Sequence, residues 1–195
     1  MTIPDKASLR AQALDHLSRL DSHPDTIETI LEAFLAEFPV FSLADKVVAL
    51  YWPIKGELDM TLFIDVLLGA KLDIALPVVV GDSKVLEFRL WDGKSELVSG
   101  GHGTKAPHET CKAVDPDIIV TPLLAFDRQG YRLGRGGGYY DATLSHCRAK
   151  KDKLIAVGLG QDAQLCLFPL PREDHDEPLD LVITETRTYR FNEKA

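Results

Sequence analysis

The most informative stretch of the sequence is Ala125-Phe126-Asp127-Arg128-Gln129-Gly130-Tyr131-Arg132-Leu133-Gly134-Arg135-Gly136-Gly137-Gly138-Tyr139-Tyr140-Asp141. It is expected to join a strand to a helix, and four of the five residues from Gly134 to Gly138 are glycine. Such a loop can bring successive backbone N–H groups close to an anion because no Cβ intervenes, and the following helix adds partial positive charge. The stretch therefore predicts a phosphate-binding loop, although taken alone it fits a flexible turn before a helix equally well. It lacks the Gly-Lys-Ser/Thr of a Walker A motif, and Tyr139 stands where GxGxxG would need its last glycine.

Strands and helices alternate on both sides of this loop. Runs of apolar and β-branched residues predict strands at 46–51, 73–80, 86–91, 117–122, 154–159 and 179–184. Apolar residues at helical spacing predict helices between Asp5 and Ser22, from Asp25 to Phe38, from about Asp59 to Gly69, and from Tyr139 to Cys147. The order favours an α/β fold with a mainly parallel sheet, helices on both faces and ligands at the strand ends.

No internal repeat or linker-like run divides the chain, so we expect residues 1–195 to form a single domain. The segment 81–116 is less regular, and Gly100-Gly101-His102-Gly103 is expected to be a loop. We expect the phenylalanines among the apolar positions to be core residues rather than a ligand-stacking group.

Composition indicates a globular protein, with 45% hydrophobic and 27% charged residues. The formal net charge of −8 argues against a nucleic-acid partner but leaves anionic small molecules open, since a few converging cations suffice for them. The three cysteines form no CxxC pair, so reduced thiols are expected. The longest apolar run, 74–80, is too short to span a bilayer, and we expect a cytoplasmic protein with no membrane partner.

Charged residues around the loop suggest what it binds. Arg132 and Arg135 can pair with phosphate oxygens through their planar guanidinium groups, and Asp141 places a carboxylate one helical turn beyond the glycines. Mg²⁺ usually takes one or two protein carboxylates together with phosphate oxygens, and Asp180, at the start of a distant predicted strand, is the candidate for the second.

The pattern Phe126-Asp127-x-x-Gly130-x-Arg132-Leu133-Gly134-x-Gly136-x-Gly138-Tyr139-Tyr140-Asp141 closely resembles the signature of the 5-formyltetrahydrofolate cyclo-ligase family. Three further blocks extend the resemblance over nearly the whole chain: Lys6-x-x-Leu9-Arg10, Gly56-Glu57-Leu58-Asp59 and His175-Asp176-x-x-Leu179-Asp180. The resemblance implies a fold like that of the NagB/RpiA/CoA-transferase group, a monomer, and small molecules as the only partners. It implies ATP-dependent closure of 5-formyltetrahydrofolate to 5,10-methenyltetrahydrofolate through a phosphorylated formyl (iminophosphate) intermediate, with ADP and phosphate released.

The same resemblance implies roles for individual residues. It gives Arg132 and Arg135 catalytic roles as stabilisers of the transferred phosphoryl group. The implied ATP-binding residues are Lys6, Arg10, Arg132, Leu133, Gly134, Arg135, Gly136, Gly137, Gly138, Tyr139 and Tyr140. The implied substrate-binding residues are Trp52, Glu57, Arg135, Gly136, Gly137, Gly138 and Tyr139. Asp141 and Asp180 are the implied ligands of Mg²⁺.

Three positions depart from the family pattern: Gly137, where many relatives have lysine, and His102 and Ala106, where an aromatic residue and an acid are common. We expect Arg135, Lys105 or Lys6 to supply the charge that is missing at position 137. His175 is interpreted as a loop residue that can hydrogen-bond metal-side carboxylates. Two alternatives stay open: an inactive protein that sequesters 5-formyltetrahydrofolate, and a sugar-phosphate isomerase or CoA-transferase relative on the same fold.

Overall fold

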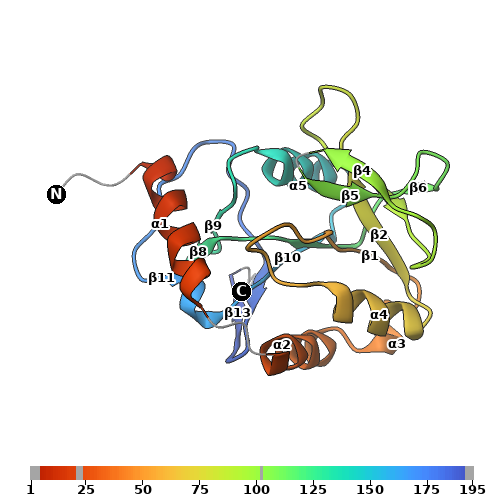
Figure 1. The fold of residues 1–195 in the computed structure, drawn as a ribbon, viewed down its shortest axis with the longest axis horizontal. Helices are drawn as coiled ribbons and strands as arrows, with labels where there is room; N and C mark the ends of the chain where they lie inside the picture. Colours follow the sequence, from red (N-terminus) through yellow and green to blue (C-terminus); the bar gives the residue numbers. More distant parts are fainter. Residues whose placement is uncertain (1–4, 21–23, 102, 192–195) are drawn as a thin grey trace.

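The computed structural model describes residues 5–20, 24–101 and 103–191, and Figure 1 shows their arrangement. The helices are α1 (Lys6–Arg19), α2 (Pro24–Glu37), α3 (Val40–Leu43), α4 (Thr61–Gly69), α5 (Tyr139–Lys150) and the 3-10 turn η1 (Asp162–Gln164). The strands are β1 (Val47–Ala49), β2 (Asp73–Val78), β3 (Glu87–Leu90), β4 (Val98–Gly101), β5 (Thr104–Ala106), β6 (Ala113–Val114), β7 (Ile118–Thr121), β8 (Ala125–Asp127), β9 (Arg132–Leu133), β10 (Ile155–Leu159), β11 (Leu165–Cys166), β12 (Leu181–Ile183) and β13 (Thr188–Arg190).

The main sheet has the strand order β13-β12-β10-β7-β1-β2-β3-β6. Its five central strands, from β12 to β2, are parallel, β13 pairs antiparallel at one edge, and at the other edge β3 pairs antiparallel with β2 and β6 antiparallel with β3. The predicted mainly parallel sheet is thus confirmed. Strands that run in the same direction place their carboxyl ends along one edge, which is where the loops that bind ligands gather.

Helices cover both faces of this sheet, as predicted. In Figure 1, α5 lies on one side of the sheet, and α2, α3 and α4 lie on the other. The second group packs through Phe34 and Phe63, whose rings meet edge to face at 5.6 Å, and through the buried Leu43 of α3. Helix α5 buries Leu144 and Cys147 against the opposite face.

Helix α1 belongs to a separate, smaller unit beside the main sheet. Strands β8, β9 and β11 form a three-stranded sheet in the order β11-β8-β9. Leu9 and Ala13 of α1 pack against its buried residues, but no residue of α1 is itself buried. The helix begins where the sequence predicts, because the Asp5 carboxylate accepts a hydrogen bond of 2.7 Å from the Ser8 N–H and so caps the first turn.

The segment 100–103 corrects one expectation. Gly100 and Gly101 are not loop residues but the end of β4, which pairs with β5 in an antiparallel hairpin. His102 lies outside the described residues. A Cβ at Gly100 would lie 2.6 Å from the Thr104 hydroxyl oxygen, so the glycine permits a close cross-strand approach rather than marking a turn.

Within the described residues, no helix combines the length and the apolar character that crossing a bilayer would require.

Candidate active site

A cleft of about 640 Å³ opens at the carboxyl ends of the central parallel strands. Tyr51 and Trp52 lie just after β1, Val79 follows β2, and Pro122 follows β7, and all four line the cleft. The cleft therefore lies at the edge of the sheet where the sequence predicted ligands to sit.

The glycine loop between β9 and α5 forms one wall of the cleft. Gly136 has φ +95° and Gly138 has φ +72°, values in the left-handed region that favours glycine. A Cβ at Gly136 would also lie 3.0 Å from Cζ of Arg10, so the side-chain-free backbone lets a guanidinium lie directly against the loop. Gly138 is the N-cap of α5 and, having no side chain, makes no side-chain capping bond to that helix end. Backbone N–H groups at a helix start are natural donors to an anion.

Arg132 and Asp141 form a largely buried ion pair in the cleft wall. The side chain of Arg132 is 4% exposed and that of Asp141 is 21% exposed. Arg132 Nη2 donates to Asp141 Oδ1 at 3.0 Å, and Nη1 donates to the Glu177 carbonyl oxygen at 3.1 Å. Burial lowers the pKa of Arg132, while the charges of Asp141 and Asp176 oppose that effect. The arginine is therefore held by two acceptors, and it lines the cleft.

Glu57 and Arg135 form a second ion pair among the residues that line the cleft. Arg135 Nε donates to Glu57 Oε1 at 3.2 Å, and Arg135 Nη2 donates to the Lys55 carbonyl oxygen. The Glu57 side chain is 7% exposed and also accepts from the Ile54 N–H at 3.1 Å. Burial raises the pKa of Glu57, and the hydrogen bonds from Ile54 and Arg135 only partly offset the effect. A desolvated carboxylate of this kind is a strong acceptor for N–H donors of a ligand.

Two cations reach the cleft from α1. Arg10 Nε donates to the Gly134 carbonyl oxygen at 2.9 Å, which ties α1 to the glycine loop. The Lys6 ammonium is bonded to Asp176 and Glu173, with the nearest oxygen of each at 2.6 Å. Burial disfavours the charged form of Lys6, but these two carboxylates outweigh it and raise its pKa.

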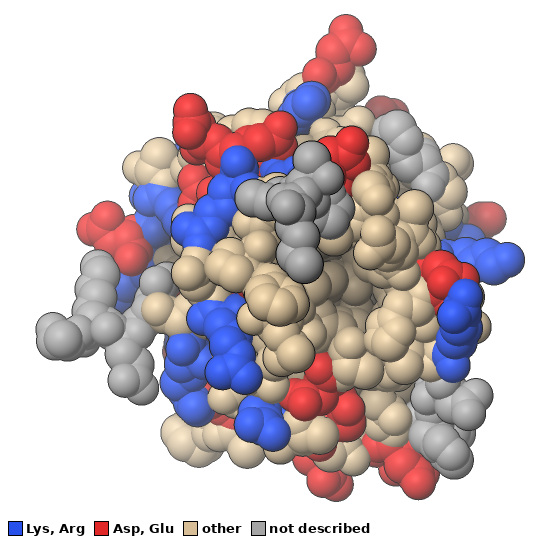
Figure 2. All heavy atoms as spheres, turned by 90° about the vertical axis from the view of Figure 1, so that its left-hand side faces the viewer, with Lys and Arg blue, Asp and Glu red and all other residues tan. Residues whose placement is uncertain are grey.

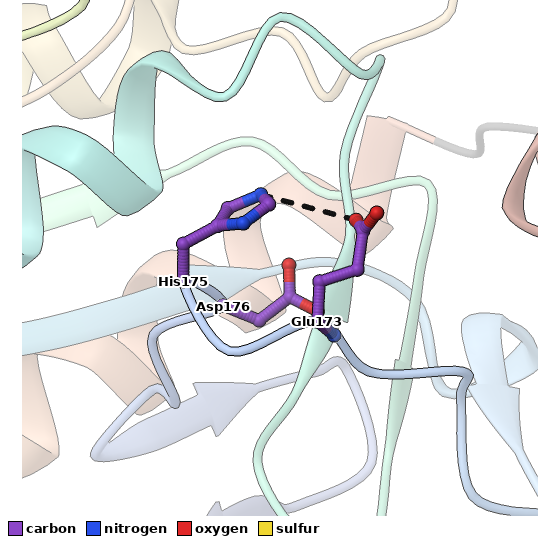
Figure 3. A group of neighbouring side chains, drawn as sticks. All are labelled: Glu173, His175 and Asp176. Carbon is purple, nitrogen blue, oxygen red and sulfur yellow. Dashed lines mark hydrogen bonds and ion pairs between the residues drawn. The ribbon is translucent and has the colours of Figure 1, made fainter.

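The partners of Lys6 come from the loop before β12, shown in Figure 3. Glu173, His175 and Asp176 each offer one ligand atom within 4.8 Å of the others, and the His175 ring faces the Glu173 carboxylate at 3.8 Å. Lys6 lowers the pKa of Asp176 against the effect of its burial. The two acids were not among the predicted site residues. The acidic run 173–177 was the signal that could have found them, because it overlaps the start of the resemblance block that begins at His175.

Aromatic residues form the remaining wall. Trp52 packs edge to face on Trp91 at 5.8 Å, and the Lys105 ammonium lies 5.5 Å from the centre of the Trp52 ring. Tyr140 packs against the core under α5, and burial raises its pKa. The Tyr139 ring instead lies over Gly137, where a Cβ would be 2.7 Å from Cδ2 of the ring. The two neighbouring tyrosines therefore have different environments, one in the core and one at the loop.

The structure brings together all the predicted site residues except one. Lys6, Arg10, Trp52, Glu57, Asp141 and the whole run from Arg132 to Tyr140 line the same cleft. Asp180 does not line it. Its carboxylate accepts from the Ala156 N–H at 2.7 Å and from Arg148 at 3.2 Å, at the point where β12 begins. The start and the end of a parallel strand lie at opposite edges of the sheet, which separates Asp180 from Asp141 in space.

Positive charge in the cleft is local rather than a property of the surface. Figure 2 shows the face that carries α1, and on it basic and acidic side chains lie in small groups of either sign around a mainly uncharged centre. In a chain with a formal net charge of −8, anions are favoured only where a few cations and backbone N–H groups converge.

Comparisons with known proteins bear on this cleft. A family model described as the 5-formyltetrahydrofolate cyclo-ligase family matches residues 3–185. A 5-formyltetrahydrofolate cyclo-ligase of Escherichia coli (strain K12) is 36% identical over 149 residues, covering 74% of this chain and 80% of the relative. One from Mycolicibacterium smegmatis is 30% identical over 195 residues, covering 96% and 97%. The NMR structure of Aquifex aeolicus 5,10-methenyltetrahydrofolate synthetase superposes with a TM-score of 0.78 at 30% identity, covering 97% of this chain and 94% of that one. The matched region includes α1, the glycine loop and the acidic run before β12.

Proposed function

The chain belongs to the 5-formyltetrahydrofolate cyclo-ligase family, and from this premise we propose that it closes 5-formyltetrahydrofolate to 5,10-methenyltetrahydrofolate with ATP as co-substrate. The proposal rests on three features that line one cleft: the start of α5 at Gly138, a glycine loop with positive φ angles, and the cations of α1 and β9. These groups suit a polyphosphate, and the aromatic and acidic walls beside them suit a heterocyclic ligand.

ATP would lie with its phosphates on the loop Gly134–Gly138. Backbone N–H groups at the start of α5 would donate to phosphate oxygens, and the guanidinium of Arg10 lies directly against Gly136. Lys6 supplies a second cation from the same helix. Arg132 and Arg135 flank the glycines and would stabilise the charge that spreads over the equatorial oxygens of the transferred phosphoryl group.

The folate would lie toward Trp52 and Glu57. The Glu57 carboxylate is desolvated and keeps acceptor capacity beyond its bonds to Ile54 and Arg135, so it suits the amino and ring N–H donors of a pterin. Trp52 offers an aromatic wall whose orientation is fixed by Trp91. Glu57 and Arg135 are bonded to each other, so a folate on Glu57 and a phosphate on Arg135 would lie side by side.

The reaction needs positioning and charge stabilisation more than a protein nucleophile. The N5-formyl oxygen is a poor leaving group, so it first attacks the γ-phosphorus of ATP and ADP departs. N10 then attacks the formyl carbon, phosphate leaves with the former formyl oxygen, and loss of the N10 proton gives the methenyl product. Rigidly held donors such as Arg132 stabilise the charge that develops in the first step, and the two bound reactants gain from being held together.

Magnesium fits the oxygen ligands of the cleft, and we propose that Asp141 and Asp176 hold it. Both carboxylates line the cleft, and both act on the pKa of Arg132 through their charge. Asp176 takes the place of Asp180 in the proposal, because Asp180 is bonded to Ala156 and Arg148 outside the cleft. When bound there, Mg²⁺ would neutralise part of the negative charge of the phosphates.

We further propose that residues 1–195 act as one domain and as a monomer on small molecules, without nucleic-acid or membrane partners. A cytoplasmic location would keep the free thiols of Cys111, Cys147 and Cys166 reduced.

The test is the near-ultraviolet absorbance of methenyltetrahydrofolate when the purified protein meets 5-formyltetrahydrofolate and MgATP. We expect product formation that stops without ATP and with EDTA. A folded protein that binds 5-formyltetrahydrofolate but gives no product would instead support a sequestering role, which the intact Arg132–Asp141 pair disfavours.

A further inference from the structure

Lys84 lies beside the glycine loop although it is distant from it in sequence. The residue belongs to the connection between β2 and β3. Its ammonium nitrogen is 3.7 Å from the position that a Cβ at Gly138 would occupy, and its Cδ is 3.9 Å from the same point. Gly138 is the N-cap of α5 and lines the cleft. The Lys84 ammonium therefore lies near the start of α5, next to the glycine loop.

This position is electrostatically unfavourable for a lysine in the protein alone. The start of an α-helix carries partial positive charge, so cations are favoured at its other end. Within the described residues, Lys84 makes no hydrogen bond or ion pair that would offset the repulsion. An anion bound at the loop would offset the repulsion between the ammonium and the helix start, because both would attract the anion.

The other cations near the loop are already engaged by protein groups. Arg135 is paired with Glu57, and Lys6 with Glu173 and Asp176. Lys105 lies over the ring of Trp52. A ligand phosphate must compete with these partners for charge, whereas no described carboxylate is paired with Lys84.

The backbone around Lys84 is attached to the same helix. The Leu86 N–H donates to the Thr143 hydroxyl at 2.9 Å, and this hydroxyl in turn donates to the Tyr139 carbonyl oxygen at 2.6 Å. Ser83 accepts a bond from the Val85 N–H at 3.0 Å, which forms a local turn. The connection from β2 to β3 is therefore fastened to the first turn of α5, and Lys84 is carried with it.

We propose that Lys84 is a further ATP-binding residue, whose ammonium contacts the phosphate chain held by the glycine loop. The proposal rests on the proposed function of the cleft. It adds a cation that comes from the β2–β3 connection, outside the four sequence blocks that define the family resemblance. Many relatives have a lysine at the position of Gly137. In this chain Lys84, rather than Arg135, Lys105 or Lys6, then supplies the positive charge that this lysine would provide.

The experiment compares Lys84→Met and Lys84→Arg with Lys94→Met in the full chain. Lys84 and Lys94 are both exposed, and neither is among the residues that line the cleft; only Lys84 has its ammonium within 4 Å of a Cβ built at Gly138, so Lys94, in the β3–β4 connection, controls for loss of one surface charge. ATP affinity is measured by calorimetry without folate, and KM is measured separately for ATP and for 5-formyltetrahydrofolate. We expect Lys84→Met to weaken ATP binding about tenfold, as loss of one charge-assisted hydrogen bond does, with the KM for folate within about twofold. Lys84→Arg should recover much of the lost ATP affinity. The difference in ATP affinity between Lys84→Met and wild type should become smaller at high salt.

The outcomes separate the two proposals. If the wild type turns over and Lys84→Met binds ATP as tightly as Lys94→Met, Lys84 has no part in ATP binding while the proposed function stands. A rise in the KM for folate equal to that for ATP would also overturn the Lys84 proposal, because a folded but generally disturbed cleft explains it. If the wild type neither binds ATP nor forms product, the proposed function itself fails and Lys84 with it.

Discussion

The buried pair of Arg132 and Asp141 allows a double-mutant cycle that separates its structural role from its catalytic role. In Arg132→Met, the Asp141 carboxylate loses its cation and the Glu177 carbonyl loses a donor. Removing one partner of a buried pair costs about 3–5 kcal/mol. Asp141 is 21% exposed and keeps the bond from the Glu177 N–H at 3.2 Å, so we expect the lower end, about 3 kcal/mol.

Asp141→Asn leaves the buried charge of Arg132 without its carboxylate partner. Arg132 is 4% exposed and would keep only the Glu177 carbonyl and a neutral amide as partners, so a loss of about 3–5 kcal/mol is expected. The double variant buries neither charge alone and should lose about 2 kcal/mol less than the sum of the singles. Since domains of this kind unfold with about 5–15 kcal/mol, the single variants should remain folded.

Activity should follow a different rule from stability. Each single variant and the double variant should lose about 10²–10³ in kcat, since the double variant restores no donor to the phosphoryl group. Free energies of unfolding are measured by urea titration with the fluorescence of the two tryptophans, and kcat by the absorbance of methenyltetrahydrofolate. Near-normal turnover in either single variant would refute the assignment of the pair to the active site. Strict additivity of the stability losses would refute the charge coupling.

Three further predictions concern the cleft. Burial raises the pKa of Glu57 above its ordinary value of 4.5, so its ionised form destabilises the folded state once the pH rises through the raised pKa. Glu57→Gln should therefore have a higher free energy of unfolding than wild type at neutral pH and the same one below about pH 4.5, as denaturant titrations at several pH values would show, and it should bind folate more weakly. A difference in unfolding free energy that does not change with pH would contradict the raised pKa as its cause. Gly136→Ala should lose about 1–2 kcal/mol in thermal or urea unfolding because its φ is +95°, whereas Gly134→Ala, with no atom within 4 Å of a Cβ, should lose less than about 1 kcal/mol; equal losses would exclude backbone strain. Asp176→Asn should raise the Mg²⁺ concentration for half-maximal activity and Asp180→Asn should not, as a magnesium titration of each variant would show; the reverse result would restore Asp180 as the metal ligand.

Regular elements could be predicted from the sequence wherever one physical signal dominates. The apolar period of α2 and the β-branched runs of β7 and β10 each identify a buried face, and the structure has these elements at nearly the predicted bounds. The position of the glycine loop before α5 was also predicted, and the structure gives Gly136 and Gly138 positive φ angles and Gly137 a close contact with the Tyr139 ring.

Short strands and spatial pairings could not be predicted in the same way. Strands β9 and β11 have two residues each, too few for a periodic pattern, and they exist because they pair with β8. The positions of Asp176 and Asp180 relative to the cleft were hidden from the sequence for a related reason. Both acids lie in one resemblance block, and only the fold shows that Asp176 is bonded to Lys6 while Asp180 lies just before β12 and is bonded to the Ala156 N–H.

Helix α1 gives the cleft two of its cations yet has no buried residue. It is held by the contacts of Leu9 and Ala13, by the bonds of Lys6 and Arg10, and by a contact of 3.1 Å between the His16 ring and the Ala163 carbonyl. Few apolar contacts mean a low free energy of local opening, so backbone amides of α1 should exchange with deuterium far sooner than those of β7 or β10. A nucleotide that engages Lys6 and Arg10 would slow exchange in α1 selectively, because it would add contacts to those that already hold the helix.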